Sequence, residues 1–549
     1  MGIRISVIVA VYNPGSHFDD LIDSFLRQSL PADEFEVLLC DDGSNDETQA
    51  RLDVVAAAHP HLKVLKLEHS GWPGTPRNVG IDTAAGKYVY FCDHDDTFGD
   101  EALERLANYA DANNSDVVVG KLTGAGRVLP RGMFRKNIPN AVLGQDPLLE
   151  ILTPHKLFRT EFIREHGIRF PDGKVRLEDH MFVMKAYFAA DVISILADYP
   201  CYYWTKRTDQ PSASATQLEP GPYFHYLGVV LDIVEENVEP GPKRDAMLQH
   251  WYRGKVLKRL SGRIMLGYTE EYRQEFLDVV RPFTLERFGP EVDQYLAFPM
   301  RVRSALLRAN DVEGLLELAR IESELKSSAQ VASISWDDSK RLQLEIESRA
   351  FFPDGSELEF EPTDSGWRWR PPPTFTSEVF TDDLLDVGSD LAGSKTEVFV
   401  RARHDSSDYV QPQDGPAPLP GPGLIRSTVT IDPRNARSGR SMTKFSDLIA
   451  QVSYSGWNFG TSVRIDPELL AQAELSERTI GKRAFAVKTR GANRLFVEAR
   501  KLPPPPPKAA AAPKKKAVVK PPPPLSTRVV SKAKGLVGVA GRRIRKIMS

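Results

Sequence analysis

Short apolar segments alternate with helix-length segments through residues 1–120, and this alternation constrains the fold more than any other feature of the sequence. Residues Phe18–Ser29 place apolar side chains on one helical face. Strands separated by helices indicate a mostly parallel, Rossmann-like sheet covered on both faces. The predicted strands are Ile5–Val11, Glu36–Cys40, Lys63–Leu67, Lys87–Cys92 and Asp116–Gly120.

Polar clusters follow three of these predicted strands directly. They are Tyr12-Asn13, Asp41-Asp42-Gly43-Ser44 and Asp93-His94-Asp95-Asp96. In sheets of this kind ligands bind beyond the carboxyl ends of the strands. We therefore expect the three clusters to share one rim and to form a binding site.

The cluster Asp93–Asp96 offers hard carboxylate oxygens of the kind that Mg²⁺ or Mn²⁺ prefers. We expect Asp93 and Asp95 to converge on one ion that bridges to diphosphate oxygens. Each acidic turn also has a simpler interpretation: an acidic turn after a strand is often only solvated, and Asp42 could cap the next helix. The presence of both turns favours the binding site.

Two further segments carry candidate functional residues. Arg77 follows a loop rich in Gly and Pro, and its planar guanidinium suits a phosphate or a nucleotide, although a surface ion pair is the simpler alternative. Glu178 and Asp179 stand before an apolar run. Neighbouring carboxylates at a helix start commonly stabilise the helix dipole, but a transfer reaction to a hydroxyl needs one carboxylate as the base.

The remainder of the chain divides by its pattern into further regions. Helical spacing of apolar residues dominates from about Glu219 to Leu325, and short alternating runs between Pro-rich segments follow, as in one or two β-sandwich domains. The predicted boundaries are 1–218 for the α/β domain, 219–327 for a helical extension, 328–500 for β-sandwich structure, 501–525 for a Pro/Lys/Ala-rich linker and 526–549 for a basic amphipathic helix.

Charge is distributed unevenly along the chain. Residues 501–549 hold 13 lysines and arginines and no acidic residue, which leaves 58 basic against 74 acidic residues in 1–500. We expect a disordered basic tail that binds an anionic membrane surface. Residues Val529–Met548 would form a basic amphipathic helix when they meet that surface. A solvated terminal helix, or one that binds nucleic acid or another anionic polymer, is the alternative.

The three cysteines form no CxxC pair, which favours a reducing cytoplasm. The sequence has no run of 18 apolar residues that could span a membrane. Together with the basic tail, these features predict a cytoplasmic protein that is peripheral at the inner membrane surface. We expect no nucleic-acid partner.

The segment Arg253–Arg263 holds five cations in eleven residues. One interpretation is an ordinary solvated helix face. The other is that Arg253, Lys255 and Arg259 bind the phosphates of a polyanion.

In their order along the chain, these motifs resemble glycosyltransferase family 2, whose catalytic domain has the GT-A fold. A closer resemblance, over residues 1 to about 265, is to the wall teichoic acid poly(ribitol-phosphate) β-N-acetylglucosaminyltransferases. It is carried by Gly71–Val79, Ser115–Lys121, Leu152–Thr160, Glu178–Tyr187 and Tyr202–Arg207. Beyond Ser327 only the architecture is similar, and in that family the β domains serve oligomerisation, which implies a homo-oligomer here.

The resemblance implies a role for each candidate residue. Asp179 would be the general base and Glu178 its neighbour, while Asp93 and Asp95 would hold Mn²⁺ or Mg²⁺. Tyr12 would stack on uracil, Asp42 would accept its N–H, and Arg207 would approach the diphosphate or the acceptor. The donor contacts implied together are Tyr12, Asp42, His69, Arg77, Asp93, His94 and Arg207. The family often has Asn where His69 stands, which leaves the exact sugar open.

The implied function is an inverting, metal-dependent transfer of a sugar, with N-acetylglucosamine favoured, from a UDP-sugar to a hydroxyl of a polyol-phosphate polymer such as teichoic acid. A processive polysaccharide synthase is disfavoured because the chain has no Gln-x-x-Arg-Trp motif. The alternative from another class is a non-catalytic GT-A scaffold that binds polymer. Metal-dependent release of UDP would distinguish the two.

Overall fold

The computed structural model describes residues 2–125, 129, 131–205, 217–364, 366–413, 421–473 and 475–503. Arg207, nearly all of the predicted linker 501–525 and the whole predicted helix 526–549 lie outside these residues. The helices that the structure describes include none with the length and apolar character needed to cross a membrane.

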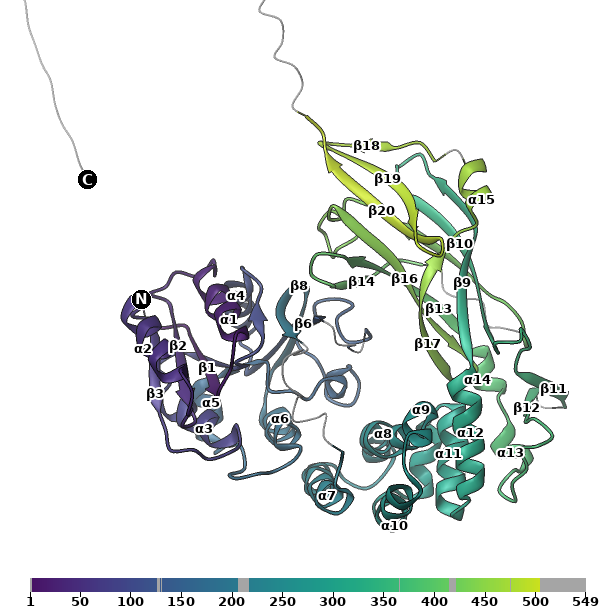
Figure 1. Ribbon diagram of the computed structural model, residues 1–549, viewed down its shortest axis with the longest axis horizontal. Helices are drawn as coiled ribbons and strands as arrows, with labels where there is room; N and C mark the ends of the chain where they lie inside the picture. The colour runs from purple at the N-terminus through teal and green to yellow at the C-terminus, as the bar shows by residue number, and fades with distance from the viewer. Residues whose placement is uncertain are drawn as a thin grey trace, which may run out of the picture. The chain divides into compact units, whose positions relative to one another are not determined.

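The first eight strands form one mixed sheet with the order β3-β2-β1-β4-β7-β6-β8-β5 (Figure 1). β1 runs parallel to β2 and β4, whereas β7 runs antiparallel to both of its neighbours. All five strands predicted from the sequence are confirmed. The strands are β1 (Ile5–Val11), β2 (Phe35–Asp41), β3 (Leu62–Lys66), β4 (Tyr88–Asp93), β5 (Thr97–Phe98), β6 (Val117–Ala125), β7 (Leu157–Arg159) and β8 (Ile193–Thr205).

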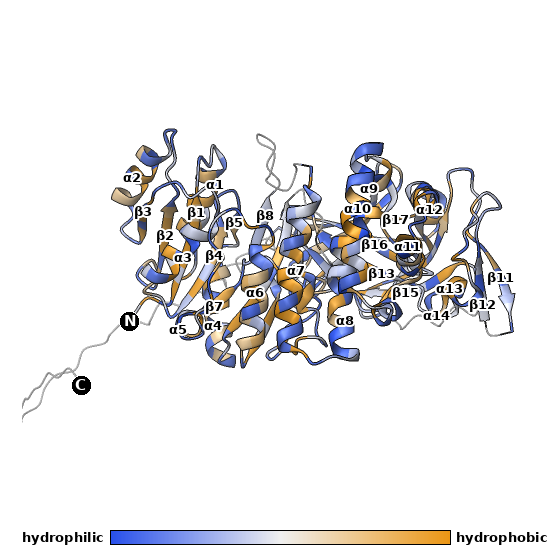
Figure 2. Ribbon diagram, turned by 90° about the horizontal axis from the view of Figure 1, so that it is seen from below, coloured by the Kyte–Doolittle hydropathy of each residue, from blue (hydrophilic) through white to orange (hydrophobic). Residues whose placement is uncertain are grey.

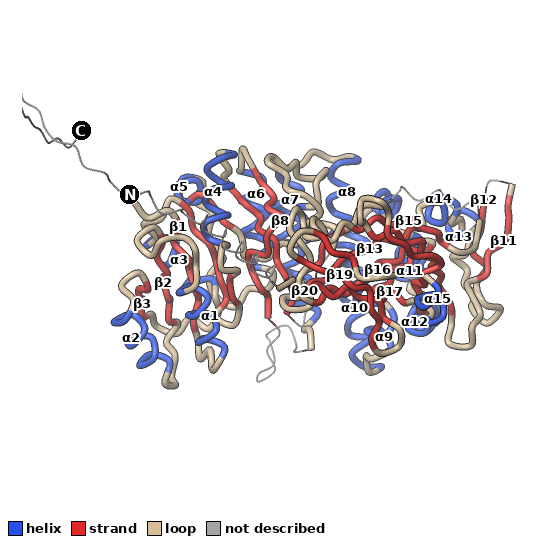
Figure 3. Tube along the Cα trace, turned by 90° about the horizontal axis from the view of Figure 1, so that it is seen from above, coloured by secondary structure: helices blue, strands red, loops and turns tan. Residues whose placement is uncertain are grey.

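Helices cover this sheet, and β1 and β2 are almost entirely buried, which explains their continuous apolar sequences (Figures 2 and 3). Helix α3 lies directly on β1, because a Cβ on Gly80 would lie 2.3 Å from a methyl group of Ile8. This close packing places Arg77 at the end of β4. The helices are α1 (His17–Leu26), α2 (Thr48–Ala58), α3 (Gly74–Thr83), α4 (Ala102–Asn113), α5 (Thr160–Glu165) and α6 (Glu178–Ala189).

The predicted helical extension is present but is less regular than its apolar spacing indicated. Within the region from about Glu219 to Leu325, a π-helical turn (Tyr252–Val256) and a 3₁₀ turn (Leu257–Leu260) interrupt the predicted helical structure. Gly262, with φ of +42°, begins the next short helix. The α-helices are α7 (Pro220–Asn237), α8 (Pro242–Trp251), α9 (Gly262–Leu266), α10 (Glu270–Arg287), α11 (Phe298–Ala309) and α12 (Val312–Glu324).

The C-terminal region is rich in β-structure, as predicted, and its strands join into one ten-stranded sheet with the separate hairpin β11–β12 (Figure 1). Burial alternates along β10, so one face of that strand is packed and the other is more open. The strands are β9 (Lys326–Trp336), β10 (Leu342–Phe351), β11 (Glu359–Thr363), β12 (Gly366–Arg370), β13 (Lys395–Ala402), β14 (Asp408–Val410), β15 (Ile425–Ile431), β16 (Phe445–Tyr454), β17 (Trp457–Arg464), β18 (Arg478–Ile480), β19 (Arg483–Arg490) and β20 (Arg494–Lys501).

Candidate active site

The loops that follow β1 and β2 meet at one edge of the first sheet. The backbone N–H of Asn13 donates to Ser44 Oγ at 3.1 Å, and the N–H of Asn45 donates to Asn13 Oδ1 at 3.1 Å. Gly43 has φ of +70°, and a Cβ there would lie 2.9 Å from the backbone nitrogen of His69. Glycine is therefore needed where these loops approach each other.

The buried carboxylate of Asp42 holds the loop that precedes α3. Its Oδ1 accepts from the backbone N–H of Ser70 at 2.9 Å and from Ser70 Oγ at 2.7 Å, and its Oδ2 accepts from the N–H of Gly71 at 3.0 Å. The His69 ring stacks on Tyr12 with 4.4 Å between ring centroids. Asp42 thus organises the loop, and a contact to a base would use its remaining acceptor capacity.

A cavity of about 920 Å³ lies at this edge and brings the predicted motifs together. Glu178 and Asp179 line this cavity, and most of its other lining residues belong to two walls. We use "strand-end wall" for Tyr12, Asp42, His69, Arg77, Asp93, His94 and Asp95. We use "helical wall" for Tyr223, Lys255, Arg259, Ile264, Tyr268 and Tyr272.

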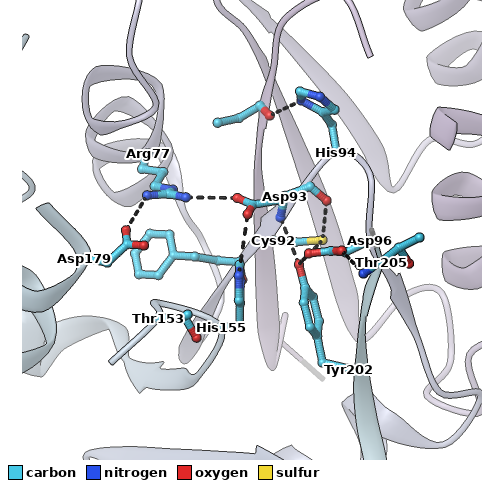
Figure 4. Close-up of polar contacts among 12 residues, drawn as sticks. Arg77, Cys92, Asp93, His94, Asp96, Thr153, His155, Asp179, Tyr202 and Thr205 are labelled. Atoms are coloured by element: carbon cyan, nitrogen blue, oxygen red, sulfur yellow. Dashed lines mark hydrogen bonds and ion pairs between the residues drawn. The ribbon is translucent and has the colours of Figure 1, made fainter. Parts of the chain in front are cut away.

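Arg77 lies between carboxylates from two distant parts of the chain (Figure 4). Its Nη2 donates to Asp93 Oδ1 at 2.9 Å and its Nη1 donates to Asp179 Oδ1 at 2.9 Å, while Glu178 Oε1 lies 3.8 Å away. The guanidinium is 4% exposed and lies over the Phe170 ring. Burial opposes its charge, but the three carboxylates together raise the pKa of Arg77 above its usual value. One guanidinium therefore connects β4 with the start of α6.

Glu178 and Asp179 form the first turn of α6. The side chain of Glu178 is 11% exposed and that of Asp179 is 27% exposed. Burial, reinforced by Asp179, raises the pKa of Glu178 to about 8. Burial also raises the pKa of Asp179, against the opposing charge of Arg77. Asp179 therefore combines better access to the cavity with increased affinity for a proton, as a general base requires.

The turn Asp93–Asp96 is fixed to the end of β8 by its last residue. Asp96 Oδ2 accepts from the Tyr202 hydroxyl at 2.7 Å, and its Oδ1 accepts from the backbone N–H of Thr205 at 2.7 Å (Figure 4). The Tyr202 hydroxyl also accepts from the N–H of Asp93 at 3.0 Å. Burial, with the nearby charges of Asp93 and Asp95, raises the pKa of Asp96 well above its usual value.

Sequence reasoning missed His155, which lies beside Asp93. Its ring is 2% exposed and stacks on Tyr202 with 4.5 Å between centroids. Burial lowers the pKa of His155 to about 4, so the ring is neutral at pH 7. Since Nδ1 lies 3.3 Å from the Phe91 carbonyl and must donate there, the Nε2 lone pair faces Asp93 Oδ2 at 3.5 Å. The available signal was a polar His-Lys pair directly before a predicted apolar segment.

These facing acceptors fit a cation. Asp93, Asp96 and His155 offer ligand atoms that all lie within 4.8 Å of one another. Both oxygens of Asp96 already accept hydrogen bonds from β8. Asp95, the predicted partner of Asp93, is outside this group but lines the cavity. Carboxylate oxygens of this kind suit Mg²⁺ or Mn²⁺.

Two of the three cations predicted to bind an acceptor reach the cavity. Burial, with Arg259 and Lys258 nearby, lowers the pKa of Lys255 to about 8. Arg259 lies over the Tyr223 ring at 4.6 Å, and its Nε donates to the Lys255 carbonyl at 3.2 Å. Arg253 does not line the cavity, because its Nη2 pairs with Glu150 at 3.0 Å. Arg207 lies outside the described residues.

The mixed sheet, the acidic turn after β4 and the carboxylate pair at the start of α6 define a GT-A glycosyltransferase domain. Comparison with known families agrees: residues 6–177 match glycosyl transferase family 2, and residues 220–319 match the glycosyl transferase TarS linker domain. Residues 6–177 therefore form a glycosyltransferase family 2 domain.

Curated relatives and a solved structure are similar to this chain. A poly(ribitol-phosphate) beta-glucosyltransferase of Bacillus spizizenii is 31% identical over 60% of this chain and 52% of its own length. The poly(ribitol-phosphate) beta-N-acetylglucosaminyltransferase TarS of Staphylococcus aureus is 32% identical over 56% of this chain and 54% of its own length. The chain thus spans about half the length of these relatives. The crystal structure of S. aureus TarS 1-349 in complex with UDP-GlcNAc matches with a TM-score of 0.54 and 25% identity. The match covers 68% of this chain and 97% of that structure's chain.

Proposed function

We propose that the protein transfers a sugar, with N-acetylglucosamine the leading candidate, from a UDP-sugar to a hydroxyl of a polyol-phosphate polymer, with inversion at the anomeric carbon. The observation that carries this proposal is the bridge that Arg77 forms between Asp93 and Asp179 within one cavity. It joins a nucleotide-side carboxylate to a candidate base. Support comes from relatives whose names include poly(ribitol-phosphate) and from the UDP-GlcNAc complex of TarS.

In the proposed reaction Asp179 accepts the proton of the acceptor hydroxyl. The hydroxyl oxygen bonds to the anomeric carbon as the bond from that carbon to UDP breaks, so a single displacement inverts the configuration. The raised pKa of Asp179 favours the proton transfer. Arg77 holds the carboxylate toward the cavity. Asp93 and Asp95 would hold a divalent cation, which when bound supplies positive charge for the departing diphosphate.

The remaining cavity residues divide between the two substrates. Tyr12 is 37% exposed, and a nucleobase would stack on the ring face that His69 does not cover. Asp42, His69, Arg77, His94 and Arg207 complete the proposed donor contacts. Lys255 and Arg259 on the helical wall would bind phosphates of the acceptor. Membrane attachment through the basic tail and oligomerisation through the β-structure remain parts of this proposal.

The test is release of UDP from purified protein with Mn²⁺ and a panel of UDP-GlcNAc, UDP-Glc and UDP-GalNAc, with and without a ribitol-phosphate polymer. We expect release with one preferred donor, which the polymer increases. A chain that releases UDP from no donor would instead support the non-catalytic, polymer-binding alternative.

A further inference from the structure

Three arginines lie side by side on adjacent strands of the C-terminal sheet. Arg490 of β19 is paired with Arg494 of β20, and Arg494 is paired with Arg464 of β17. Residues paired directly across strands point to the same face. Strands are about 4.8 Å apart, so this set, the "arginine row", spans roughly 10 Å.

The arginine row does not stabilise the sheet by itself, because like charges directly opposite each other are destabilising. Arg490 is compensated by Asp447, whose Oδ2 lies 2.7 Å from its Nη2. Arg464 and Arg494 are exposed, and neither forms an ion pair within the part of the chain that the structure describes. Arg494 Nε donates only to the Gly491 carbonyl at 3.1 Å. Two guanidinium groups therefore remain available for an external anion.

Other cations extend the row on the same face. Lys488 precedes Arg490 by two residues on β19, and Arg403 lies 4.9 Å from the centroid of the Phe496 ring. The acidic residues that contact this group are Asp447 and Glu498. Two carboxylates therefore accompany a group of five cations: Arg403, Arg464, Lys488, Arg490 and Arg494. On the same face, Arg401 is neutralised by Asp408 and Arg500 by Glu477, so the excess positive charge lies in this group of five.

The same sheet face contacts the catalytic domain. Phe399 of β13 is paired with Ile449, and Ile449 with Ser462, which precedes Arg464 by two residues on β17. Arg131 lies 5.5 Å from the centroid of the Phe399 ring. The arginine row is thus on the face that the domain with the active site touches.

Resting on the proposed function, we propose that the arginine row is a second, non-catalytic site for the acceptor polymer, which binds a linear phosphodiester chain outside the catalytic cavity. Guanidinium groups bind phosphate oxygens through paired hydrogen bonds. A chain held here would stay bound to the protein between transfers.

Two other anionic partners fit the face less well. A membrane surface favours exposed apolar side chains, and the large exposed ones among the described residues lie outside β16, β17, β19 and β20. Single-stranded nucleic acid stacks its bases on open aromatic faces, whereas Arg403 lies over both Phe445 and Phe496.

The test uses the full chain with Arg464→Gln and Arg494→Gln combined. Binding of a labelled long ribitol-phosphate polymer is measured by fluorescence anisotropy across salt concentrations. We expect about tenfold weaker binding and a salt slope that is smaller by about 1.4, since two phosphate contacts are lost at about 0.7 each. The matched control is Lys185→Gln on α6 combined with Lys482→Gln in the turn between β18 and β19, which removes the same charge from exposed positions away from the row.

Folding and catalysis provide the accompanying measurements. The thermal midpoint of the row variant should equal or exceed that of the wild type, because a like-charge repulsion is removed. The KM for the long polymer should rise, while the KM for the UDP-sugar and the rate with a short ribitol-phosphate oligomer stay unchanged.

Three results would overturn the inference: unchanged polymer binding, equal weakening in the control, or stronger row-dependent binding to phosphatidylglycerol vesicles than to the polymer. The anisotropy measurement needs no transfer. Absence of UDP release would therefore contradict the proposed function, whereas polymer binding that is independent of the row would contradict only this inference.

Discussion

The strand-end wall and the helical wall of the cavity differ in how their charges are compensated. On the strand-end wall, Asp42 is held by hydrogen bonds of its neighbouring loop, and Asp93 by Arg77. On the helical wall, Lys255 and Arg259 form no ion pair with a carboxylate in the described part of the chain. The first wall is therefore organised before any ligand binds, whereas the second would gain its counter-charges from the anionic acceptor that we propose.

The largest effect should come from Asp179, the proposed base, which lines the same cavity as both walls. Asp179→Asn keeps the shape of the side chain but removes its ability to accept the proton, so kcat should fall by ~10²–10⁴-fold. Initial rates of UDP release with saturating acceptor measure this. The control is Asp278→Asn, on the exposed surface of α10. A loss below tenfold would transfer the role of base to another group.

Removal of the divalent cation should affect only the strand-end wall. Chelation with EDTA, or Asp95→Asn, should reduce UDP release by about 10²-fold or more, because a metal supplies several kcal/mol of charge stabilisation. Titration of Mn²⁺ into the apo protein measures its affinity independently of turnover. Full activity after exhaustive chelation would contradict the assignment of Asp93 and Asp95.

Charge reversal on the helical wall should affect the acceptor and spare the donor. Arg259→Glu should raise the KM for the polymer by about tenfold, and the wild-type KM should rise with salt because screening shortens the reach of exposed charges. Steady-state kinetics with either substrate varied separate the two constants. The control is Arg263→Glu, an exposed cation on the next helix that does not line the cavity. A larger change in the donor KM would reverse the assignment of the walls.

The smallest effect concerns the dependence of stability on pH. Since burial and Asp179 raise the pKa of Glu178 from 4.5 to about 8, the folded protein keeps a proton that the unfolded chain releases in this interval. The free energy of unfolding contributed by Glu178 therefore falls as the pH rises from 4.5 to 8.

Thermal midpoints at pH 5 and pH 8 measure this effect. Glu178→Gln, which cannot ionise, should show a smaller decrease between the two pH values than the wild type. Glu165→Gln, on the exposed side of α5, should behave as the wild type. Parallel decreases in the wild type and Glu178→Gln would show that another group causes the dependence.

Sequence reasoning correctly placed the turns that follow strands, although the roles of their residues stay predictions. The turns after β1, β2 and β4 follow apolar runs, so strand periodicity and the parallel-sheet rule placed them at one edge. His155 and Tyr202 were missed because their position beside Asp93 depends on how β7 and β8 are inserted in the sheet, which local pattern does not encode. Arg77 contacts Asp179, 102 positions later, which is likewise a tertiary effect.

On the helical wall the same reasoning succeeded only in part. A regular helix over Arg253–Arg263 would have been a simple cationic face. The π-helical and 3₁₀ turns redirect its side chains, so that Lys255 and Arg259 line the cavity while Arg253 pairs with Glu150. Such changes of helix type depend on packing against neighbouring helices and leave little trace in the spacing of apolar residues.

The π-helical turn at Tyr252–Val256 determines which side chains of the following segment face the cavity. A π-turn holds one residue more than an α-turn, and each residue of an α-helix advances by about 100°. Loss of a single residue here would restore regular winding and rotate the following side chains away from the pocket. The shape of the proposed acceptor site can therefore change through the length of one short segment, without any substitution among the residues of the strand-end wall.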